Sequence, residues 1–353
     1  MKAIVLNQPQ DVSIQDLPIP EIGDDQCLLK VQVAAICVND VRDYKGGVKW
    51  TYPRIGGHEY SAVIEKVGKN VNPQHFRIGQ KVIAFVLEDC GYCDSCKHGH
   101  ANICDNSTNG PLYYNEGGIS GFKGFSQYVA MDARYLYPCP EDANEEELSL
   151  TEPLACVLNS IDKANIEMGD DVVVIGGGAM GMLHVLCAKK QGARVILSET
   201  DEKRRAFGLE LGADVVINPM DSDPVQQVKE LTNGRGANVV FNTTAIPAVA
   251  SQAIEMTAKN GLCNMFSSIH PNEPIPVNAG RLHSQEITVT GTQNGTVKSF
   301  AQSIDCISKG IINVRPLIDK IYDFNQAKEA LEYASRPDTY KVLMRFAKEE
   351  SSD

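Results

Sequence analysis

The sequence predicts an α/β protein of two domains, one rich in β-strands and one built on a doubly wound parallel sheet. Its 353 residues suffice for two domains of roughly 150 residues each. Up to about residue 135, short β-forming runs are separated by glycine and proline. From about residue 150 onward, apolar strands alternate with helical stretches, which is typical of a parallel sheet covered on both faces.

The β-rich part contains four clear predicted strands, at 2–6, 27–35, 61–67 and 81–85. Few stretches in this part repeat apolar residues at helical spacing. The last sixty or so residues add a helix at 298–309, a strand at 318–322, a helix at 326–335 and a strand at 341–346. These late elements are expected to rejoin one of the two domains.

The second part begins with a predicted helix at 152–164 and then alternates strands and helices. The strands are expected at 171–175, 194–197, 214–217, 238–241, 261–266 and 287–290. The helices are expected at 180–191, 202–211, 224–231 and 247–259. Alternation of this kind predicts parallel strands joined by crossover helices.

Composition and charge exclude several classes of protein. Hydrophobic residues make up 43% and charged residues 22%, which excludes global disorder. The net charge of −12 disfavours a nucleic-acid or anionic-membrane partner, because such surfaces need clustered lysine and arginine. The first residues, MKAIVLNQPQ, lack an apolar signal core, and the uncharged stretch at 172–188 is too short to span a membrane. A cytoplasmic protein is therefore expected.

A glycine-rich turn follows the predicted strand at 171–175 and opens a helix. Gly176, Gly178 and Gly181 form a G-x-G-x-x-G pattern that also includes Ala179 and Met180. In this context, the pattern indicates a dinucleotide site, because the first glycine permits a tight turn and the second lets the backbone approach a pyrophosphate. The helix N-terminus adds N–H donors for the phosphates. Without its context, the motif would be an ordinary packed turn.

Glu199 ends the next predicted strand, 23 residues after Gly176. A carboxylate at this position can accept hydrogen bonds from the ribose hydroxyls of NAD and would repel the 2′-phosphate of NADP. The sequence therefore favours NAD. Lys203, Arg204 and Arg205 follow closely and leave some tolerance of NADP open, and the alternative for Glu199 is a solvated surface acid.

Eleven cysteines are present, and Cys90, Cys93, Cys96 and Cys104 lie within fifteen residues. Thiolates at this spacing can close an all-cysteine zinc site, which would be structural because no ligand position remains for water. Two disulfides and an iron–sulfur cluster are the alternatives.

A second, mixed set of metal-binding side chains is spread along the chain. Cys37, His58, Glu59 and Glu152 are each explained individually as a buried thiol, a turn histidine and two ordinary acids. Together, a thiolate, an imidazole and a carboxylate would hold zinc with one position open, which is the catalytic arrangement. Such a zinc lowers the pKa of a bound alcohol and polarises a carbonyl, as a nicotinamide hydride transfer requires.

These motifs resemble those of the zinc-dependent medium-chain alcohol dehydrogenases. The matching segments extend over nearly the whole chain: they are 35–40, 53–59, the four-cysteine segment, 124–128, 152–153, 176–181, Glu199 and 212–214. The resemblance implies a GroES-like catalytic domain (1–150 and 293–353, with the structural zinc lobe at about 88–105) and a Rossmann domain (151–292). It also implies two zinc ions per chain and a cleft between the domains where the catalytic zinc meets the nicotinamide.

The resemblance also assigns roles to individual residues. Cys37 and His58 correspond to catalytic zinc ligands, and either Glu59 or Glu152 corresponds to the carboxylate ligand. Asp40 corresponds to a carboxylate that orients the ligand histidine. Glu152, where simple alcohol dehydrogenases have a cysteine, implies the sorbitol, polyol and sugar-phosphate dehydrogenase branch.

Two positions depart from the family pattern. Asn39 stands where the family has a serine or threonine that relays the substrate proton, and a carboxamide cannot do this. We therefore expect zinc-bound water held by Glu152 or Glu59 to replace the relay. Arg42 stands where threonine dehydrogenases have a histidine and could bind an anionic substrate group, although it could equally pair with Asp43 or with a cofactor phosphate.

The expected activity is NAD- and zinc-dependent oxidation of a secondary alcohol on a polyol, sugar acid or sugar phosphate. The resemblance places Tyr52 and Phe125 in the pocket wall, and Gln293 and Asn294 could face the pocket. A threonine-type dehydrogenase, a general alcohol dehydrogenase and a non-catalytic NAD-binding regulator remain alternatives. A homo-dimer or homo-tetramer is expected from the family.

Overall fold

The chain folds into two compact units, and each is described separately. The computed structural model describes residues 1–47, 51–107, 118–269 and 271–346. Unit 1 comprises Met1–Pro153 and Thr296–Asp353, and unit 2 comprises Leu154–Gly295. None of the helices in the described ranges combines the length and apolarity that a bilayer crossing demands.

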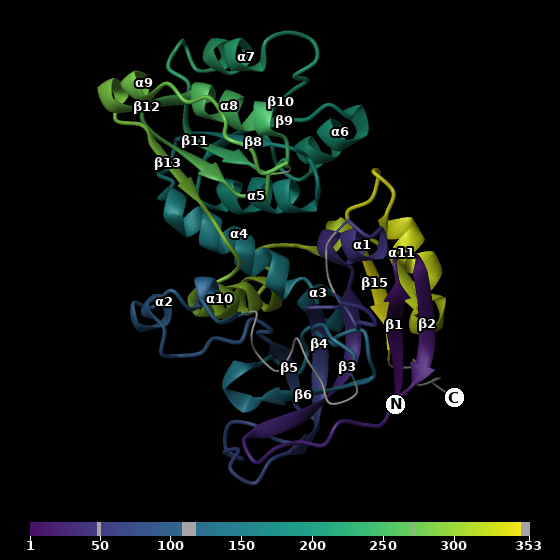
Figure 1. Cartoon of the computed structure of the whole chain (residues 1–353). Helices are drawn as coiled ribbons and strands as arrows, with labels where there is room; N and C mark the ends of the chain where they lie inside the picture. Colours follow the sequence, from purple (N-terminus) through teal and green to yellow (C-terminus); the bar gives the residue numbers. More distant parts are fainter. Residues whose placement is uncertain (48–50, 108–117, 270, 347–353) are drawn as a thin grey trace. The chain divides into compact units, whose positions relative to one another are not determined.

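Unit 1 is built on a mixed seven-stranded sheet with strand order β14-β15-β3-β4-β5-β7, while β6 also pairs with β3 (Figure 1). Its strands are β3 (Gln26–Ala35), β4 (Glu59–Val67), β5 (Lys81–Ala84), β6 (Tyr128–Asp132), β7 (Leu136–Pro138), β14 (Ile318–Asp323) and β15 (Lys341–Arg345). A separate antiparallel pair is formed by β1 (Lys2–Gln8) and β2 (Asp11–Asp16). The late strand β15 thus lies beside the early strand β3, with Leu343 opposite Ala35.

The helices of unit 1 are short, except for α10, which begins where the chain re-enters unit 1 after unit 2. They are α1 (Val38–Tyr44), α2 (Asp94–Lys97), α3 (Glu145–Leu148), α10 (Val297–Ser308) and α11 (Ala327–Ala334), with 3-10 turns η1 (Ala101–Ile103), η4 (Ala133–Tyr135), η5 (Arg315–Leu317) and η6 (Phe324–Gln326). The helix α1 was not predicted, because seven residues are too few to show an apolar repeat.

Unit 2 is a parallel six-stranded sheet with the order β10-β9-β8-β11-β12-β13. In chain order this is 3-2-1-4-5-6, the order of a Rossmann sheet. The strands are β8 (Asp171–Ile175), β9 (Arg194–Ser198), β10 (Val215–Ile217), β11 (Ala237–Asn242), β12 (Thr257–Met265) and β13 (Thr288–Gly291). The predicted α/β class with a doubly wound parallel sheet is confirmed.

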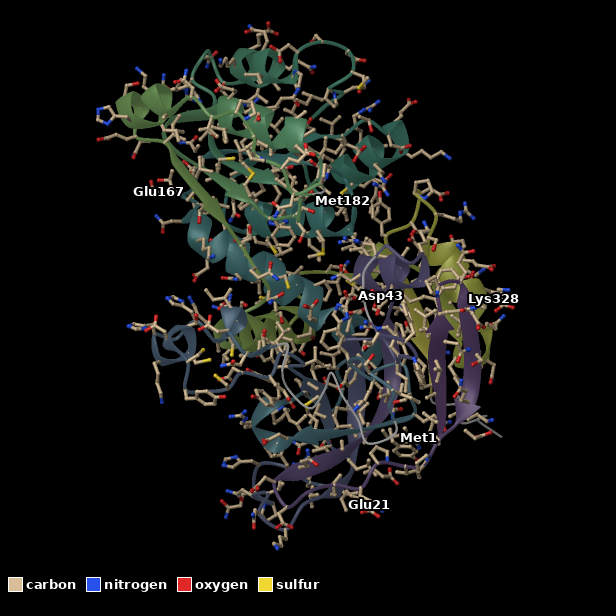
Figure 2. All side chains as sticks on the ribbon, in the orientation of Figure 1. Met1, Glu21, Asp43, Glu167, Met182 and Lys328 are labelled. Atoms are coloured by element: carbon tan, nitrogen blue, oxygen red, sulfur yellow. The ribbon has the colours of Figure 1, made fainter. Side chains whose placement is uncertain are left out.

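Helices cover both faces of this sheet, with α5 against one face and α8 against the other (Figure 1). The helices are α4 (Thr151–Ala164), α5 (Ala179–Lys190), α6 (Glu202–Glu210), α7 (Pro224–Leu231), α8 (Pro247–Met256) and α9 (Ala279–Gln285). Val173, Ile196 and Val240 are fully buried in the core, as is Met182 of α5, which is labelled in Figure 2.

The predicted helix at 247–259 is too long by three residues. The helix α8 ends at Met256, and Thr257 opens β12 opposite Ala237 of β11. The hydroxyl of Thr257 donates to the carbonyl of Ala253 at 3.0 Å. A β-branched residue that can pair with the neighbouring strand thus begins the strand earlier than periodicity indicates.

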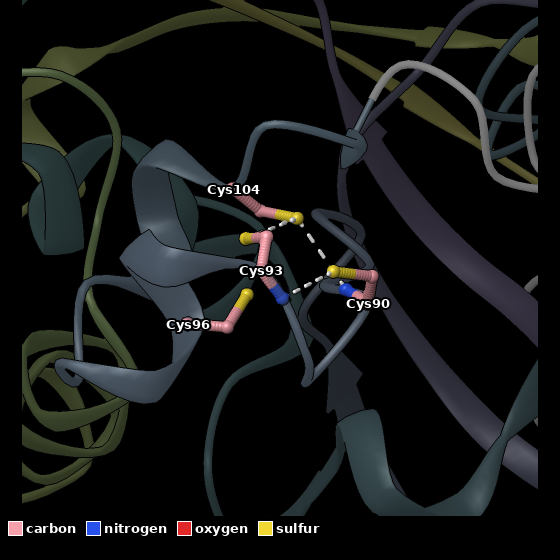
Figure 3. Close-up of side chains that lie close together, drawn as sticks. All are labelled: Cys90, Cys93, Cys96 and Cys104. Carbon is pink, nitrogen blue, oxygen red and sulfur yellow. Dashed lines mark hydrogen bonds between the residues drawn. The ribbon is translucent and has the colours of Figure 1, made fainter.

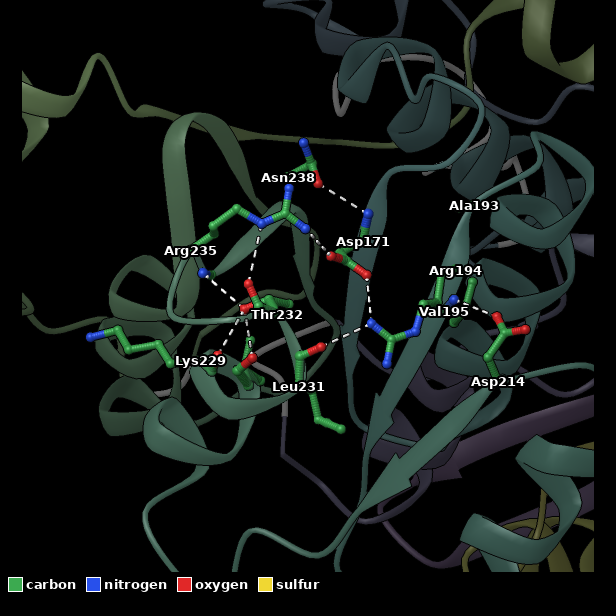
Figure 4. A network of polar contacts seen from close by, with 12 residues as sticks. Asp171, Ala193, Arg194, Val195, Asp214, Lys229, Leu231, Thr232, Arg235 and Asn238 are labelled. Atoms are coloured by element: carbon green, nitrogen blue, oxygen red, sulfur yellow. Dashed lines mark hydrogen bonds and ion pairs between the residues drawn. The ribbon is translucent and has the colours of Figure 1, made fainter.

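The amino ends of three strands in unit 2 are joined by a charged network around Asp171 (Figure 4). The buried carboxylate of Asp171 pairs with Arg194 at 2.9 Å and with Arg235 at 3.2 Å. The guanidinium of Arg194 also donates to the carbonyl of Leu231, and that of Arg235 donates to the carbonyl of Thr232. This network ties β8 and β9 to the loop that leads into β11.

Candidate active site

Three members of the mixed set of side chains come together at one end of three neighbouring strands in unit 1. On β4, Glu59 lies opposite Ala35, the last residue of β3, and Cys37 follows two residues later. The sulfur of Cys37, one ring nitrogen of His58 and one carboxylate oxygen of Glu59 all lie within 4.8 Å of one another. Strand pairing therefore gathers a thiol, an imidazole and a carboxylate that are distant in sequence.

Asp40 connects the two loops that carry this cluster. Its carboxylate accepts from the backbone N–H of Cys37 at 3.0 Å and from that of Gly57 at 3.1 Å. The distance to Nδ1 of His58 is 4.0 Å, so no hydrogen bond joins the carboxylate to the ring. Asp40 thus fixes the backbone on both sides of the cluster.

His58 has the features of a metal ligand. It is buried, and its Nδ1 has no hydrogen-bond partner among the described residues, which leaves a donor nitrogen unsatisfied. Burial alone would lower the pKa of His58, but the neighbouring thiol and carboxylates outweigh this effect and raise the pKa well above its usual value. A site with such an excess of negative groups fits a divalent cation, and the donor set of sulfur, nitrogen and oxygen fits zinc.

A buried lysine that the sequence analysis did not identify lies beside this cluster. Nζ of Lys341, at the start of β15, donates to both carboxylate oxygens of Glu59, at 2.7 and 2.5 Å. Both side chains are almost fully buried, with exposed fractions of 5% and 1%. Burial would lower the pKa of Lys341, but the charge of Glu59 raises it. Glu59 is therefore held by a cation of the protein itself.

Glu152 lies in the first turn of α4, within unit 1, and is half-buried. Within the part of the chain that the structure describes, the cluster whose ligand atoms lie within 4.8 Å of one another contains Cys37, His58 and Glu59 but not Glu152. Its charge nevertheless raises the pKa of both His58 and Lys341. Glu152 is thus electrostatically part of the site.

Asn39 and Arg42 lie on α1, directly after Cys37. Asn39 is exposed in the first turn, and Arg42 is half-buried. Asp43 pairs with the buried Arg54 at 3.2 Å rather than with Arg42. Within the described ranges, Arg42 forms no ion pair.

The aromatic residues predicted for the pocket wall occupy different environments. Tyr52 is half-buried, and its hydroxyl donates to the carbonyl of Asp43 at 3.1 Å. Phe125 is buried against the glycine turn before His58, where a Cβ on Gly57 would lie 2.5 Å from its ring. Phe122, which the sequence analysis did not identify, lies beside the cluster, with its ring centroid 5.2 Å from that of His58.

The four cysteines of the lobe lie together around α2 and η1 (Figure 3). The sulfurs of Cys93 and Cys104 are 3.9 Å apart, close to the roughly 3.8 Å that a tetrahedral zinc with Zn–S bonds near 2.3 Å would give. A disulfide would need about 2.05 Å, and all eleven cysteines are free. Cys90 and Cys104 also accept backbone hydrogen bonds, and Asn106 donates to both sulfurs at 3.3 to 3.4 Å.

The glycine turn in unit 2 has the backbone that a pyrophosphate site needs. Gly176 has a positive φ of 99°, and a Cβ on Gly181 would lie only 1.8 Å from the carbonyl oxygen of Gly176. A Cβ on Gly178 would meet only Arg204, at 3.9 Å, so this backbone is open to a ligand. Ala179 and Met180 form the first turn of α5 behind it.

The carboxylate of Glu199 is held at this turn. It accepts from the backbone N–H of Gly177 at 2.5 Å and from that of Asp201 at 2.9 Å. Partial burial would raise the pKa of Glu199, but these hydrogen bonds and the nearby Arg204 outweigh burial and lower it. An ionised carboxylate here fits the hydroxyls of a cofactor ribose.

Gln293 and Asn294 belong to unit 2, directly after β13. Their backbone carbonyls accept from Nδ2 of Asn159 on α4, at 3.4 and 2.7 Å. The side-chain amide of Gln293 donates to that of Asn294 at 3.2 Å. The two residues thus form a fixed segment at the carboxyl edge of the parallel sheet.

Two family models match the chain, and together they cover most of it. The alcohol dehydrogenase GroES-like domain matches residues 23–141, and the zinc-binding dehydrogenase domain matches residues 179–309. The first match lies in unit 1, and the second lies mostly in unit 2.

Several curated proteins are similar over nearly the full chain. A sorbitol dehydrogenase from Bacillus subtilis is 28% identical over 95% of this chain and 93% of its own length. A D-arabitol-phosphate dehydrogenase from Enterococcus avium is 28% identical over 99% of both chains. A 2-dehydro-3-deoxy-L-galactonate 5-dehydrogenase from Pseudoalteromonas atlantica is 30% identical over 86% of this chain and 85% of its own length.

Solved structures share the fold throughout. A protein assigned as a zinc-binding dehydrogenase from Sinorhizobium meliloti 1021, bound to NADP, superposes with a TM-score of 0.89 at 25% identity, over 98% of this chain and 99% of that one. A protein described as a short-chain alcohol dehydrogenase from E. coli CFT073, in complex with NADH, has a TM-score of 0.88 at 26% identity over the same shares. The motifs, the fold and these similarities together place the chain in the family of zinc-dependent medium-chain alcohol dehydrogenases, in the branch that includes the sorbitol dehydrogenases, as an oxidoreductase acting on CH–OH groups.

Proposed function

We propose that the protein oxidises a secondary alcohol of a polyol, sugar acid or sugar phosphate to the ketone, with NAD as the preferred acceptor. The observation that carries this proposal is the convergence of Cys37, His58 and Glu59 within 4.8 Å in a family of zinc-dependent dehydrogenases. Zinc held there would polarise the reacting oxygen, and a bound NAD would accept the hydride. A second zinc would hold the four-cysteine lobe.

The chain's own residues position the reactants and move the proton. Cys37 and His58 would hold the catalytic metal, and Asp40 fixes the backbone of both ligand loops. Lys341 already holds Glu59 through both carboxylate oxygens, and the charge of Glu152 acts on His58, so we assign Glu152 as the third ligand. In unit 2, the ionised Glu199 favours NAD, since it would repel a 2′-phosphate.

A glutamate, rather than the side chain of Asn39, carries the substrate proton in this proposal. The amide of Asn39 cannot ionise near neutral pH, and it is exposed. We expect Glu152→Gln to lower kcat by about 100-fold and to remove a limb of its pH profile, whereas Asn39→Ser changes kcat by less than about threefold. An unchanged kcat in Glu152→Gln would contradict this assignment.

The substrate class is tested with a panel of neutral polyols, aldonic acids and sugar phosphates, scored by NADH absorbance. Arg42 has no ion pair within the described ranges because Asp43 is taken by Arg54, so it favours a substrate with an anionic group. Arg42→Ala should lower kcat/KM for anionic substrates by about tenfold and leave neutral polyols within about twofold. Equal losses for both would remove Arg42 from substrate recognition, and turnover of only L-threonine or simple primary alcohols would overturn the proposed substrate class.

A further inference from the structure

A buried polar network in unit 2 lies outside the groups that the proposed reaction uses. It consists of His184, Ser160, Asn264 and Thr292, whose exposed fractions are 0%, 0%, 0% and 8%. Three come from α5, α4 and β12, and Thr292 directly follows β13. Buried polar groups are costly unless all their hydrogen bonds are made, so a network of this size in an apolar core requires an explanation.

The direction of each hydrogen bond in this network follows from the chemistry of its members. Nδ1 of His184 lies 2.8 Å from the carbonyl oxygen of Met180, which can only accept, so Nδ1 carries the proton. Burial lowers the pKa of His184 to about 4, so the ring is neutral near pH 7 and Nε2 is an acceptor. The hydroxyl of Ser160 therefore donates to Nε2 at 3.0 Å.

The amide of Asn264 continues the network to the edge of the sheet. Having donated its own proton, the hydroxyl of Ser160 accepts from Nδ2 of Asn264 at 3.1 Å. The hydroxyl of Thr292 lies 2.9 Å from Nδ2 and 3.1 Å from Oδ1 of the same amide. The ring of His184 is fixed from the sides by Phe241 and Phe266, with centroids 4.7 and 4.6 Å away. Every member is thus held in one orientation.

The same end of the network holds the segment 291–294. Two side chains of α4 donate to backbone carbonyls of this segment. Lys163 donates to the carbonyl of Gly291 at 2.8 Å, and Asn159 donates to the carbonyls of the two residues that follow Thr292. The backbone N–H of Thr292 donates to the carbonyl of Met265 at 3.2 Å. The backbone conformation of this segment is therefore fixed from α4, β12 and the His184 network together.

The strand order shows where this segment lies relative to a bound dinucleotide. Ligands of parallel α/β sheets bind at the carboxyl ends of the strands. Glu199, at the end of β9, would take the adenosine ribose, and the glycine turn after β8 would take the pyrophosphate. The remaining half of the molecule must then extend over β11, β12 and β13, towards Thr292.

We propose that Thr292 and the Asn264–Ser160–His184 network behind it are positioning residues for the nicotinamide half of the cofactor. The network runs from the first turn of α5, which carries the phosphate end of the site, to the segment after β13. It sets the backbone of 291–294 before the cofactor binds, so that little ordering remains to be done on binding. This inference rests on the proposed dinucleotide-dependent function.

The test compares two ligands that differ only at the nicotinamide end. NADH and ADP-ribose are titrated calorimetrically into the full-length, zinc-loaded protein, because ADP-ribose keeps the adenosine and pyrophosphate but lacks the nicotinamide. Thr292→Val should raise the Kd for NADH about tenfold and leave that for ADP-ribose within about twofold. Thr292→Ser, which keeps the hydroxyl, should bind both ligands within about twofold of the wild type.

Thr232→Val is the matched control, since Thr232 is also a buried, hydrogen-bonded threonine but lies at the amino edge of the same sheet. It should change neither Kd. Ser160→Ala, which lies farther from the ligand, should weaken NADH binding selectively but by a smaller factor. This variant replaces Thr292→Val in the test if Thr292→Val does not fold.

Three results would overturn the proposal: equal weakening of both ligands by Thr292→Val, no weakening of NADH binding, or the same effect in Thr232→Val. A wild-type protein that binds neither ligand would instead remove the proposed function, so the two failures are distinguishable.

Discussion

The ion pair between Lys341 and Glu59 combines two charges in a place where each alone would be costly. Their exposed fractions are 5% and 1%, and the ammonium lies within 2.7 Å of both carboxylate oxygens. A buried pair is no strong source of stability, but removal of one partner leaves the other charge uncompensated. The pair therefore holds Glu59 in place beside Cys37 and His58.

Lys341→Met should destabilise the protein strongly. We expect a loss of about 3–5 kcal/mol in the free energy of unfolding, measured by urea denaturation of the zinc-loaded protein. The matched control is Lys309→Met, whose lysine pairs with Asp305 on the exposed face of α10 and should cost less than about 1 kcal/mol. The double variant Lys341→Met with Glu59→Gln should recover part of the loss, and a loss as small as the control's would contradict a buried ion pair.

At this scale, the sequence identified residues by type and motif but not by partner. Cys37, His58 and Glu59 belong to motifs that can be found by eye, and the structure places them together; their role as metal ligands stays a prediction. Lys341 could not be found, because it opens an ordinary apolar strand and its partner is 282 residues away. Only the pairing of β15 with β3 brings it to the site.

The elements of unit 2 were the most predictable part of the fold. Strands buried on both faces, such as β8 and β9, appear in the sequence as continuous apolar runs. Short elements of unit 1, such as α1 and β7, have too few residues for any period to be visible. The predicted end of α8 was wrong because Thr257 pairs with β11, and a tertiary contact of this kind leaves no periodic signal in the sequence.

The Asp171 network predicts a separation between stability and cofactor binding. Asp171→Asn should cost about 2 kcal/mol in the free energy of unfolding, because both arginines lose their charged partner while remaining partly exposed. The Kd for NADH should stay within about twofold, since the network lies at the amino ends of the strands. Asp305→Asn, an exposed helical pair, is the control and should cost less than about 1 kcal/mol. A large change in Kd with unchanged stability would contradict this division.

At the scale of the whole molecule, the two metal clusters predict two zinc ions per chain with different roles. Cys37→Ala should retain one zinc, lose activity and unfold at nearly the same urea concentration as the wild type. Cys93→Ser should lose the other zinc and a large part of the stability, because a structural zinc contributes directly to folding. Inductively coupled plasma mass spectrometry, before and after dialysis against a mild chelator, measures the zinc content of each variant. The contrary result is a wild-type chain with a single zinc that is lost in Cys93→Ser and kept in Cys37→Ala. That result would contradict a catalytic zinc and favour a non-catalytic NAD-binding regulator.

The insertion of β15 beside β3 has a consequence for synthesis on the ribosome. Residues 154–295 are contiguous, so unit 2 can complete its sheet as soon as they emerge. Unit 1 must wait for β14 and β15, and until then the Val33–Ala35 end of β3, which β6 does not pair with, exposes an unpaired edge to other chains. Glu59 is also without its ion-pair partner Lys341 during that interval. The nascent chain is thus most exposed to aggregation after its second unit has formed and before its first is complete.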